Sequence, residues 1–302
     1  MLSKIKVPFF FILTLAASAL ASAFGAIPLD SPTTDWYAVS YSGTSRTDYL
    51  NDQQTGINES DLVGSDAGAS PVQTAFYYDY DGISIGFRVR VDGDGGPAGY
   101  TGAVWVGLML DGNTSVDLFA GVINKGSVKQ AGFYSPGTGA NVSPSTTSID
   151  SGTPLYSEAL SGSNYLWTPV TVGPGGNDPV PGGTADIGGD TNSDYFMTWV
   201  LPFSQLQAAA LTKGFTVTGS TPFKFVVGTS EQANSMNQDL NGTLGNTTST
   251  LTFAALGVES PTSSAGGGVV PEPGTLSCLI LAFAVGVGVS RRRSADRNSP
   301  SA

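Results

Sequence analysis

The chain lacks histidine altogether and has a single cysteine, Cys278, which lies in an apolar run near its C-terminus. Without imidazole, the sequence excludes Ser-His-Asp triads, Cys-His dyads, histidine-ligated zinc and most facial-triad iron sites. Because no cysteine precedes that run, the body of the chain cannot form an internal disulfide. Side-chain packing must therefore hold the body together, with a bound metal ion as a further source of stability.

Basic residues are also scarce, with 13 Lys and Arg against 24 Asp and Glu. Six of the basic residues lie near the two ends, so residues 27–270 hold 7 basic and 22 acidic residues, a formal charge of −15. A surface this acidic repels phosphate backbones, which argues against nucleic acid as a partner. Divalent cations and neutral glycans remain candidates.

What the sequence has in quantity is glycine and proline, 40 and 18 residues, scattered without a three-residue period. This composition predicts short elements joined by turns, as in all-β domains. Ile83, Ile85 and Phe87 alternate with polar residues or glycine, which predicts a strand with one buried and one solvated face. Other predicted strands cover residues 74–78, 104–110, 116–123, 130–134, 195–201, 215–218, 223–227 and 250–253.

We therefore expect an all-β body, a β-sandwich or jelly-roll-like domain over residues 27–257, with one short helix. That helix is predicted over residues 205–213, with Ser204 and Gln207 as a capping box and Gly214 after its last residue. The turn between the first two strands is the acidic stretch 79–82. Residues 135–194 are predicted to be long loops, because Gly, Pro, Ser and Thr dominate them.

The N-terminus has the pattern of a secretory signal peptide over residues 1–23. Lys4 and Lys6 precede an uncharged run over residues 7–20, and Ala21-Ser22-Ala23 supplies small residues for cleavage after Ala23. The run is short for a membrane span, although a retained N-terminal anchor is the alternative.

The C-terminus has three parts in a fixed order, after a Ser/Gly/Pro-rich stretch at 258–269 that predicts a flexible linker. Pro271-Glu272-Pro273-Gly274-Thr275 comes first, an uncharged run over residues 276–290 follows, and Arg291-Arg292-Arg293 ends the series. A helix over that run would be about 22 Å long, shorter than the roughly 30 Å hydrocarbon layer. The arginines favour the cytoplasmic side of a membrane, and the prolines keep the preceding backbone extended.

This order resembles the PEP-CTERM sorting signal, here residues 270–293, which implies export and processing by an exosortase, a membrane protease with a cysteine nucleophile. On that resemblance, residues 271–275 are recognised by the protease and residues 291–293 are a basic stop. The partners implied are the exosortase, the secretion machinery and, transiently, the inner membrane through a C-terminal transmembrane helix. An ordinary tail anchor is the alternative. Residues 74–96, 104–122 and 223–242 resemble uncharacterised exported β-domains of PEP-CTERM proteins, a likeness that implies a fold but no activity.

One segment has the spacing of a calcium loop. Asp111, Asn113, Ser115 and Asp117 place side-chain oxygens at every second position, although Val116 stands where an EF-hand loop has glycine and no glutamate follows at its twelfth position. A hairpin turn of ordinary turn residues is the alternative. The stretch 92–96, Asp79 with Asp81, and Asp239 with Asn241 could also supply ligands from neighbouring loops, a question that linear sequence does not decide.

Trp105 is out of phase with Val104, Val106 and Leu108 on its predicted strand, so its ring could lie on an outer face and stack on sugars. Trp36, Trp167, Tyr77 and Tyr78 are further aromatic candidates, and core packing is the alternative for all of them. No nucleophile elbow, phosphate loop or zinc-protease motif occurs, and we expect no enzyme activity.

Three functional hypotheses follow. The first is a non-catalytic protein of the cell envelope, cell surface or extracellular matrix of a polysaccharide-producing bacterium, in contact with exopolysaccharide. The second is a carbohydrate-binding module, supported or not by Ca²⁺. The third is a structural domain that Ca²⁺ stabilises.

Overall fold

The computed structural model describes residues 27–41, 47–54, 57–66, 69–93, 99–189, 191–245 and 247–266. The chain separates into residues 1–268 and residues 269–302. The predicted signal peptide, the motif at 271–275 and the arginines at 291–293 lie outside the described residues. Within the described ranges, no helix has the length and apolar character that crossing a membrane requires.

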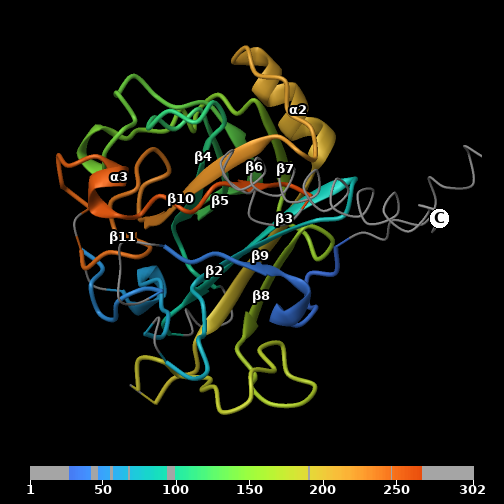
Figure 1. The fold of residues 1–302 in the computed structure, drawn as a ribbon, viewed down its shortest axis with the longest axis vertical. Helices are drawn as coiled ribbons and strands as arrows, with labels where there is room; N and C mark the ends of the chain where they lie inside the picture. Colours follow the sequence, from blue (N-terminus) through green and yellow to red (C-terminus); the bar gives the residue numbers. More distant parts are fainter. Residues whose placement is uncertain are drawn as a thin grey trace, which may run out of the picture. The chain divides into compact units, whose positions relative to one another are not determined.

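Strands dominate the described part of the chain (Figure 1). They are β1 (Tyr37–Ala38), β2 (Phe76–Tyr80), β3 (Ser84–Val91), β4 (Ala103–Met109), β5 (Leu118–Lys125), β6 (Val128–Tyr134), β7 (Tyr156–Ala159), β8 (Tyr165–Pro169), β9 (Tyr195–Pro202), β10 (Pro222–Ser230), β11 (Asp239–Leu240) and β12 (Ser263–Ser264). The helices are α2 (Phe203–Thr212) and α3 (Phe253–Leu256), with short 3-10 turns η1 (Thr33–Asp35), η2 (Asn58–Ser60) and η4 (Pro144–Thr146).

The strands form two antiparallel sheets, which confirms the all-β prediction. The five-stranded sheet has the order β1-β2-β3-β9-β8, and the seven-stranded sheet has the order β11-β10-β4-β5-β6-β7 with β12 paired to β10. The predicted turn between β2 and β3 is present, because Asp81 Oδ1 accepts the N–H groups of Ile83 and Ser84, and Gly82 adopts a φ of +94°.

The main hydrophobic core lies between the two sheets. Alternate residues of β2, β3 and β9 face alternate residues of β4, β5, β6 and β10. The ring of Phe225 on β10 shows this contact directly, because its centroid lies 5.0 Å from that of Tyr78 and 5.3 Å from that of Phe76, both on β2. Helix α2 adds Leu206 and Ala210 to this core.

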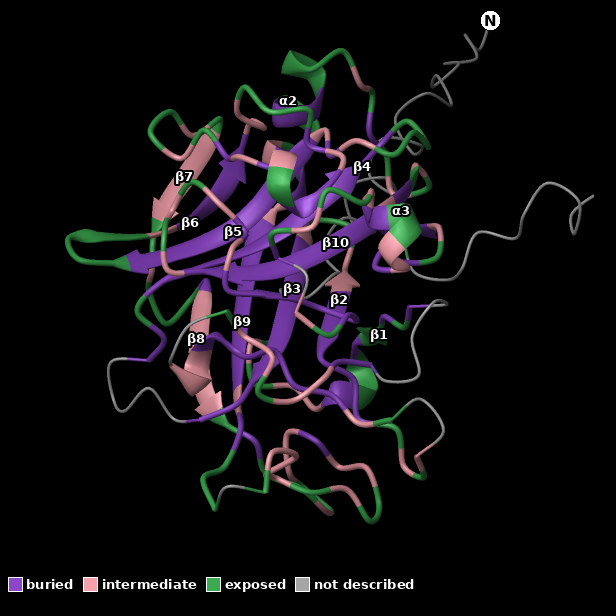
Figure 2. Ribbon diagram, turned by 90° about the vertical axis from the view of Figure 1, so that its left-hand side faces the viewer, coloured by how far each residue is buried: buried purple, intermediate pink, exposed green. Residues whose placement is uncertain are grey.

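Loops cover the outer faces of both sheets, so strand residues are buried on two sides (Figure 2). Outside the seven-stranded sheet, a second core contains Trp105, Phe119 and Tyr134 beneath Met236 and Phe253. Outside the five-stranded sheet, a third core contains Trp36, Tyr77, Val170, Phe196 and Val200.

This covering corrects the prediction that β3 has one solvated face. Arg88 is 1 % exposed and Arg90 is 0 % exposed. The guanidinium of Arg88 lies 4.4 Å from the ring centroid of Trp36 and donates hydrogen bonds to backbone oxygens of Ser31 and Leu29. The arginines are in phase as predicted, but the segment that ends at Trp36 covers Arg88, and residues 178–194 cover Arg90.

Several element boundaries differ from the predicted ones. Helix α2 begins at Phe203, so Ser204 lies inside it, and Gln207 donates to the Val217 oxygen rather than forming a capping box. Residues 215–218 form no strand. The end of the predicted strand 250–253 instead begins α3, where Thr252 Oγ1 caps the Ala255 N–H. Within residues 135–194, predicted as loops, the structure has β7 and β8.

The body also extends beyond residue 257, which corrects the predicted linker at 258–269. The Ser260 N–H donates to the Phe225 oxygen, and β12 pairs with the start of β10. Val258 and Ala265 are fully buried, so residues 258–266 are part of the packed body.

Candidate metal centre

Four aspartates come together where the N-terminal part of the body meets the edge of the seven-stranded sheet. Asp48, Asp52 and Asp61 lie in the segment before β2, and Asp239 begins the edge strand β11. Asp48, Asp61 and Asp239 have no exposed surface, and Asp52 is half-buried. The cluster therefore joins parts of the chain that are almost two hundred residues apart in sequence.

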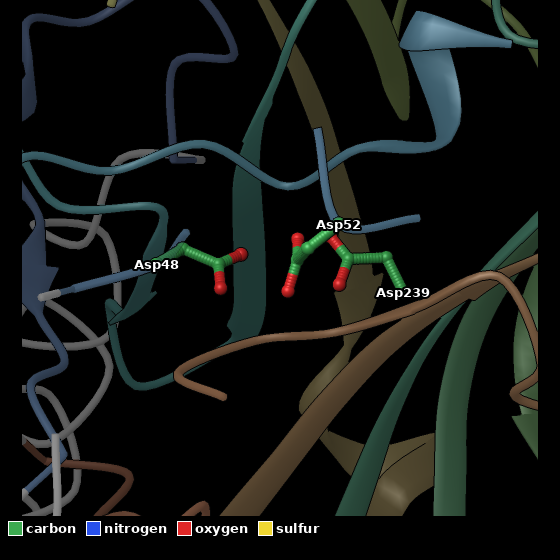
Figure 3. Close-up of side chains that lie close together, drawn as sticks. All are labelled: Asp48, Asp52 and Asp239. Carbon is green, nitrogen blue, oxygen red and sulfur yellow. The ribbon is translucent and has the colours of Figure 1, made fainter. Parts of the chain in front are cut away.

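One carboxylate oxygen from each of Asp48, Asp52 and Asp239 lies within 4.8 Å of the others. In Figure 3 the Asp48 carboxylate faces the other two across a gap. Calcium binds oxygens at about 2.4 Å, so two oxygens on one ion are at most about 4.8 Å apart. The spacing of the three residues therefore meets the distance condition for sharing a single ion.

Backbone N–H groups fix these carboxylates in place. Asp48 Oδ1 accepts the Gly242 N–H at 2.9 Å, and Asp52 Oδ2 accepts the Gly245 N–H at 2.6 Å. Asp239 Oδ2 accepts the Leu62 N–H at 2.5 Å, and its other oxygen accepts its neighbour's N–H at 2.6 Å. The backbone of the neighbouring segment therefore fixes the orientation of each carboxylate.

Asp61 supports this arrangement from the side. Its Oδ2 accepts the Asn51 N–H at 2.7 Å and its Oδ1 accepts the Asp52 N–H at 3.2 Å. These bonds hold the turn that carries Asp52. Burial is the main cause that raises the pKa values of Asp48 and Asp239, and the Asp61 charge adds to it. Asp61 is thus both a support and a fourth carboxylate near the gap.

Three buried oxygen atoms of the cluster and of the neighbouring Asn241 have no hydrogen-bond partner among the described residues. They are Oδ2 of Asp48, Oδ1 of Asp52 and Oδ1 of Asn241, and Asp48 and Asn241 are 0 % exposed. The amide nitrogen of Asn241 donates to the Tyr41 hydroxyl at 3.3 Å, whereas the amide oxygen of Asn241 accepts no hydrogen bond from the described residues. A buried acceptor without a partner costs about 1–3 kcal/mol, and more when it is charged, so such atoms need an explanation.

The pKa values of the four aspartates also favour a bound cation. Burial, followed by the charges of Asp239 and Asp52, raises the pKa of Asp48 well above its ordinary value. Burial also raises the pKa values of Asp52 and Asp239, and it raises the pKa of Asp61 to about 7. No ion pair joins a described Lys or Arg to these carboxylates. A cation supplied from solution would remove the cost of keeping them charged.

The ligand atoms at the cluster indicate which kind of cation would bind there. Carboxylate and amide oxygens are ligands for hard cations, and with no histidine in the chain and no cysteine in the body, soft metals have no preferred donor. A general acid or nucleophile has to reach its substrate, whereas Asp48, Asp61 and Asp239 have no exposed surface. The arrangement fits an enclosed cation site.

The predicted calcium loop lies elsewhere, in the exposed turn between β4 and β5. Asp111 accepts the backbone and side-chain N–H groups of Asn113, whose Oδ1 accepts the Ser115 N–H and hydroxyl. Asp117 Oδ2 accepts the Leu110 N–H at 2.6 Å. These bonds describe the hairpin turn of the alternative interpretation, and a cation in this loop stays a prediction.

Trp105 points away from the main core, as its phase predicted, but it is fully buried in the second core. Its ring packs edge-on against Tyr134 at a centroid distance of 5.0 Å, and the ring lies against Gly121. The loops over the seven-stranded sheet cover the face where a sugar would stack. This corrects the expectation of an exposed glycan platform at Trp105. Of the other aromatic candidates, Trp36, Tyr77 and Tyr78 are buried as well.

Among the remaining predicted ligands, Asp239 and Asn241 are brought to the cluster, and Asp79 and Asp81 are not. Asp81 instead holds the β2–β3 turn. Asp48, Asp52 and Asp61 were missed, because each stands alone among turn residues without a ligand-like spacing. The sequence distinguishes them only as acidic residues that precede the predicted strand at 74–78, in a body with few basic residues.

No family model matches the chain, and no curated protein or solved structure matches it.

Proposed function

We propose that this chain is an exported, non-catalytic protein of the bacterial cell envelope whose β-sandwich body is completed by a bound calcium ion. The observation that carries the cation is the enclosed cluster of Asp48, Asp52 and Asp239, with the buried Asp48 oxygen that no hydrogen bond satisfies. Calcium fits because it accepts six to eight oxygen ligands in flexible geometry, including amide oxygens and water.

Export through a signal peptide and sorting through a PEP-CTERM tail rest on the sequence at residues 1–23 and 270–293. Outside the inner membrane, a body without disulfides gains stability from a metal ion that crosslinks distant segments. The role is display on the cell surface or in the extracellular matrix, with exopolysaccharide as the contacted material.

The cation part of the proposal is tested by melting the purified full-length protein in EDTA and in millimolar calcium. Calcium should raise the melting temperature, by roughly 5–10 °C when its concentration is about 100 times the dissociation constant. Equal melting temperatures in both buffers would refute the cation site.

The sorting part needs a separate experiment in cells that possess an exosortase. A chain that ends before residue 270 should fractionate differently from the full-length chain, because it lacks the motif at 271–275 and the arginines at 291–293. Identical fractionation of the two chains would refute the sorting role without touching the cation site.

A further inference from the structure

The four aspartates of the cluster also attach one segment of the chain to the sheet. We call this segment, residues 47–54 and 57–62, the strap. It contains no strand, and its regular structure is the single 3-10 turn η2. It reaches the body at the edge strand β11 and at the turn after it, over residues 238–245.

Apolar burial holds the strap only weakly. Tyr49, Leu50 and Ile57 are half-buried, and Leu62 at the end of the strap is fully buried. At about 25 cal/mol per Å² of apolar surface, three half-buried side chains contribute little against the entropy of ordering a segment without regular structure. Other contacts must fasten most of its length.

Those contacts run through the cluster. Three of the bonds between the strap and residues 238–245 end on the carboxylates of Asp48, Asp52 and Asp239. The backbone adds one more, from the Gln54 N–H to the Gln238 oxygen at 2.6 Å. Near Leu62 the strap is also held by the backbone, where the Asp92 N–H donates to the Asp61 oxygen at 2.9 Å. Over residues 48–54, however, most of the bonds to residues 238–245 involve the groups that repel one another when no cation is present.

We infer that the bound cation is a clasp: calcium fastens the strap over the β11 edge of the seven-stranded sheet, and its removal releases the strap while the two sheets stay packed. This inference rests on the proposed calcium site and assigns that site a regulatory effect. Strand edges pair readily with other chains, so the strap protects β11 and the neighbouring part of β10 where calcium is abundant. Calcium-poor surroundings would open that edge.

Amide hydrogen exchange of the full-length protein, followed by mass spectrometry, tests the clasp in EDTA and in millimolar calcium. In EDTA, peptides from the strap and from residues 238–245 should exchange within minutes while peptides from β3 and β9 stay protected. Calcium should slow exchange in the strap at least tenfold. The Asp48→Asn variant should lose most of this slowing, and Asp111→Asn, which removes one acidic charge from an exposed turn, should keep it.

The outcomes separate the two proposals. If calcium binds and raises the melting temperature, but the strap in EDTA is as protected as β3, the clasp is wrong and the calcium site stands. If calcium changes neither exchange nor melting, the site itself is wrong. Equal calcium responses in Asp48→Asn and Asp111→Asn would place any bound ion outside the cluster, which also overturns the clasp.

Discussion

Two clusters of buried aspartates occur in the described part of this body, and they differ in what balances their charge. On the outer face of the five-stranded sheet, Asp178 and Asp194 surround Arg90. The guanidinium lies 3.0 Å from Asp178 Oδ2 and 2.6 Å from Asp194 Oδ2, with all three side chains 0 % exposed. The Nη2 group of Arg90 also donates to the Thr184 oxygen at 2.7 Å. The chain supplies this cation itself.

At the edge of the seven-stranded sheet, Asp48, Asp52, Asp61 and Asp239 lie together with no described base paired to any of them. The charges that raise the pKa values of Asp48 and Asp239 are those of other aspartates. Asp48, Asp61 and Asp239 have no exposed surface, like Asp178 and Asp194, whereas Asp52 is half-buried. The comparison supports the proposal that a cation from solution is the positive partner at the second place.

The largest expected effect comes from removing the internal cation, the guanidinium of Arg90. Arg90→Met leaves Asp178 and Asp194 buried without a positive charge, which should lower the free energy of unfolding by about 3–5 kcal/mol. Urea denaturation measures the change, with Lys129→Met on the exposed part of β6 as the control, expected within about 0.5 kcal/mol of the parent. If both variants unfolded at the same urea concentration, the Arg90 pairs would not stabilise the body.

A smaller effect, of opposite sign in two buffers, is expected at the cluster. In Asp48→Asn the oxygen can still accept the Tyr49 and Gly242 N–H groups, and an amide replaces the unpaired Oδ2. In EDTA the variant should be about 1 kcal/mol more stable than the parent, because one repelling charge is gone. In calcium it should be about 2 kcal/mol less stable, because a ligand is lost. The same sign in both buffers would contradict a cation at Asp48.

The pH dependence of the calcium-free protein should be smaller still. The pKa of Asp61 is about 7 in the folded protein and 3.8 as the reference value, so the folded state holds the proton more tightly. The stability from this group is present below the unfolded pKa and is lost as the pH rises through about 7. In EDTA the free energy of unfolding should therefore fall by about 1–2 kcal/mol between pH 6 and pH 8.

Calcium should weaken or reverse that pH dependence, because a bound ion requires the charged carboxylates. Thermal melts at both pH values, in both buffers, measure it. A calcium-free protein that is more stable at pH 8 than at pH 6 would show that these carboxylates are not the groups that dominate the titration.

Much of the fold follows from local patterns in the sequence. The alternation at Ile83, Ile85 and Phe87 predicted β3, and the turn at Asp81-Gly82 predicted its pairing with β2. The same alternation could not show that Arg88 and Arg90 are buried, because the covering segments come from residues 27–36 and 170–194. A strand pattern shows which residues share a face, and only tertiary structure shows what lies on that face.

The candidate site was predictable only in part, for the same reason. Asp239 and Asn241 have a ligand-like spacing within one loop, and the structure places them at the cluster. Asp48, Asp52 and Asp61 reach the same place through long-range folding that no local pattern encodes. The regular spacing at Asp111–Asp117 was the stronger sequence signal, yet its oxygens accept hydrogen bonds from their own turn.

Calorimetric titration of the metal-free, full-length protein with calcium is the most direct test that a solution cation balances the buried aspartates. We expect one strong site per chain that Asp48→Asn weakens at least tenfold and Asp111→Asn leaves unchanged. Absence of binding by the parent protein, or equal binding by both variants, would contradict it.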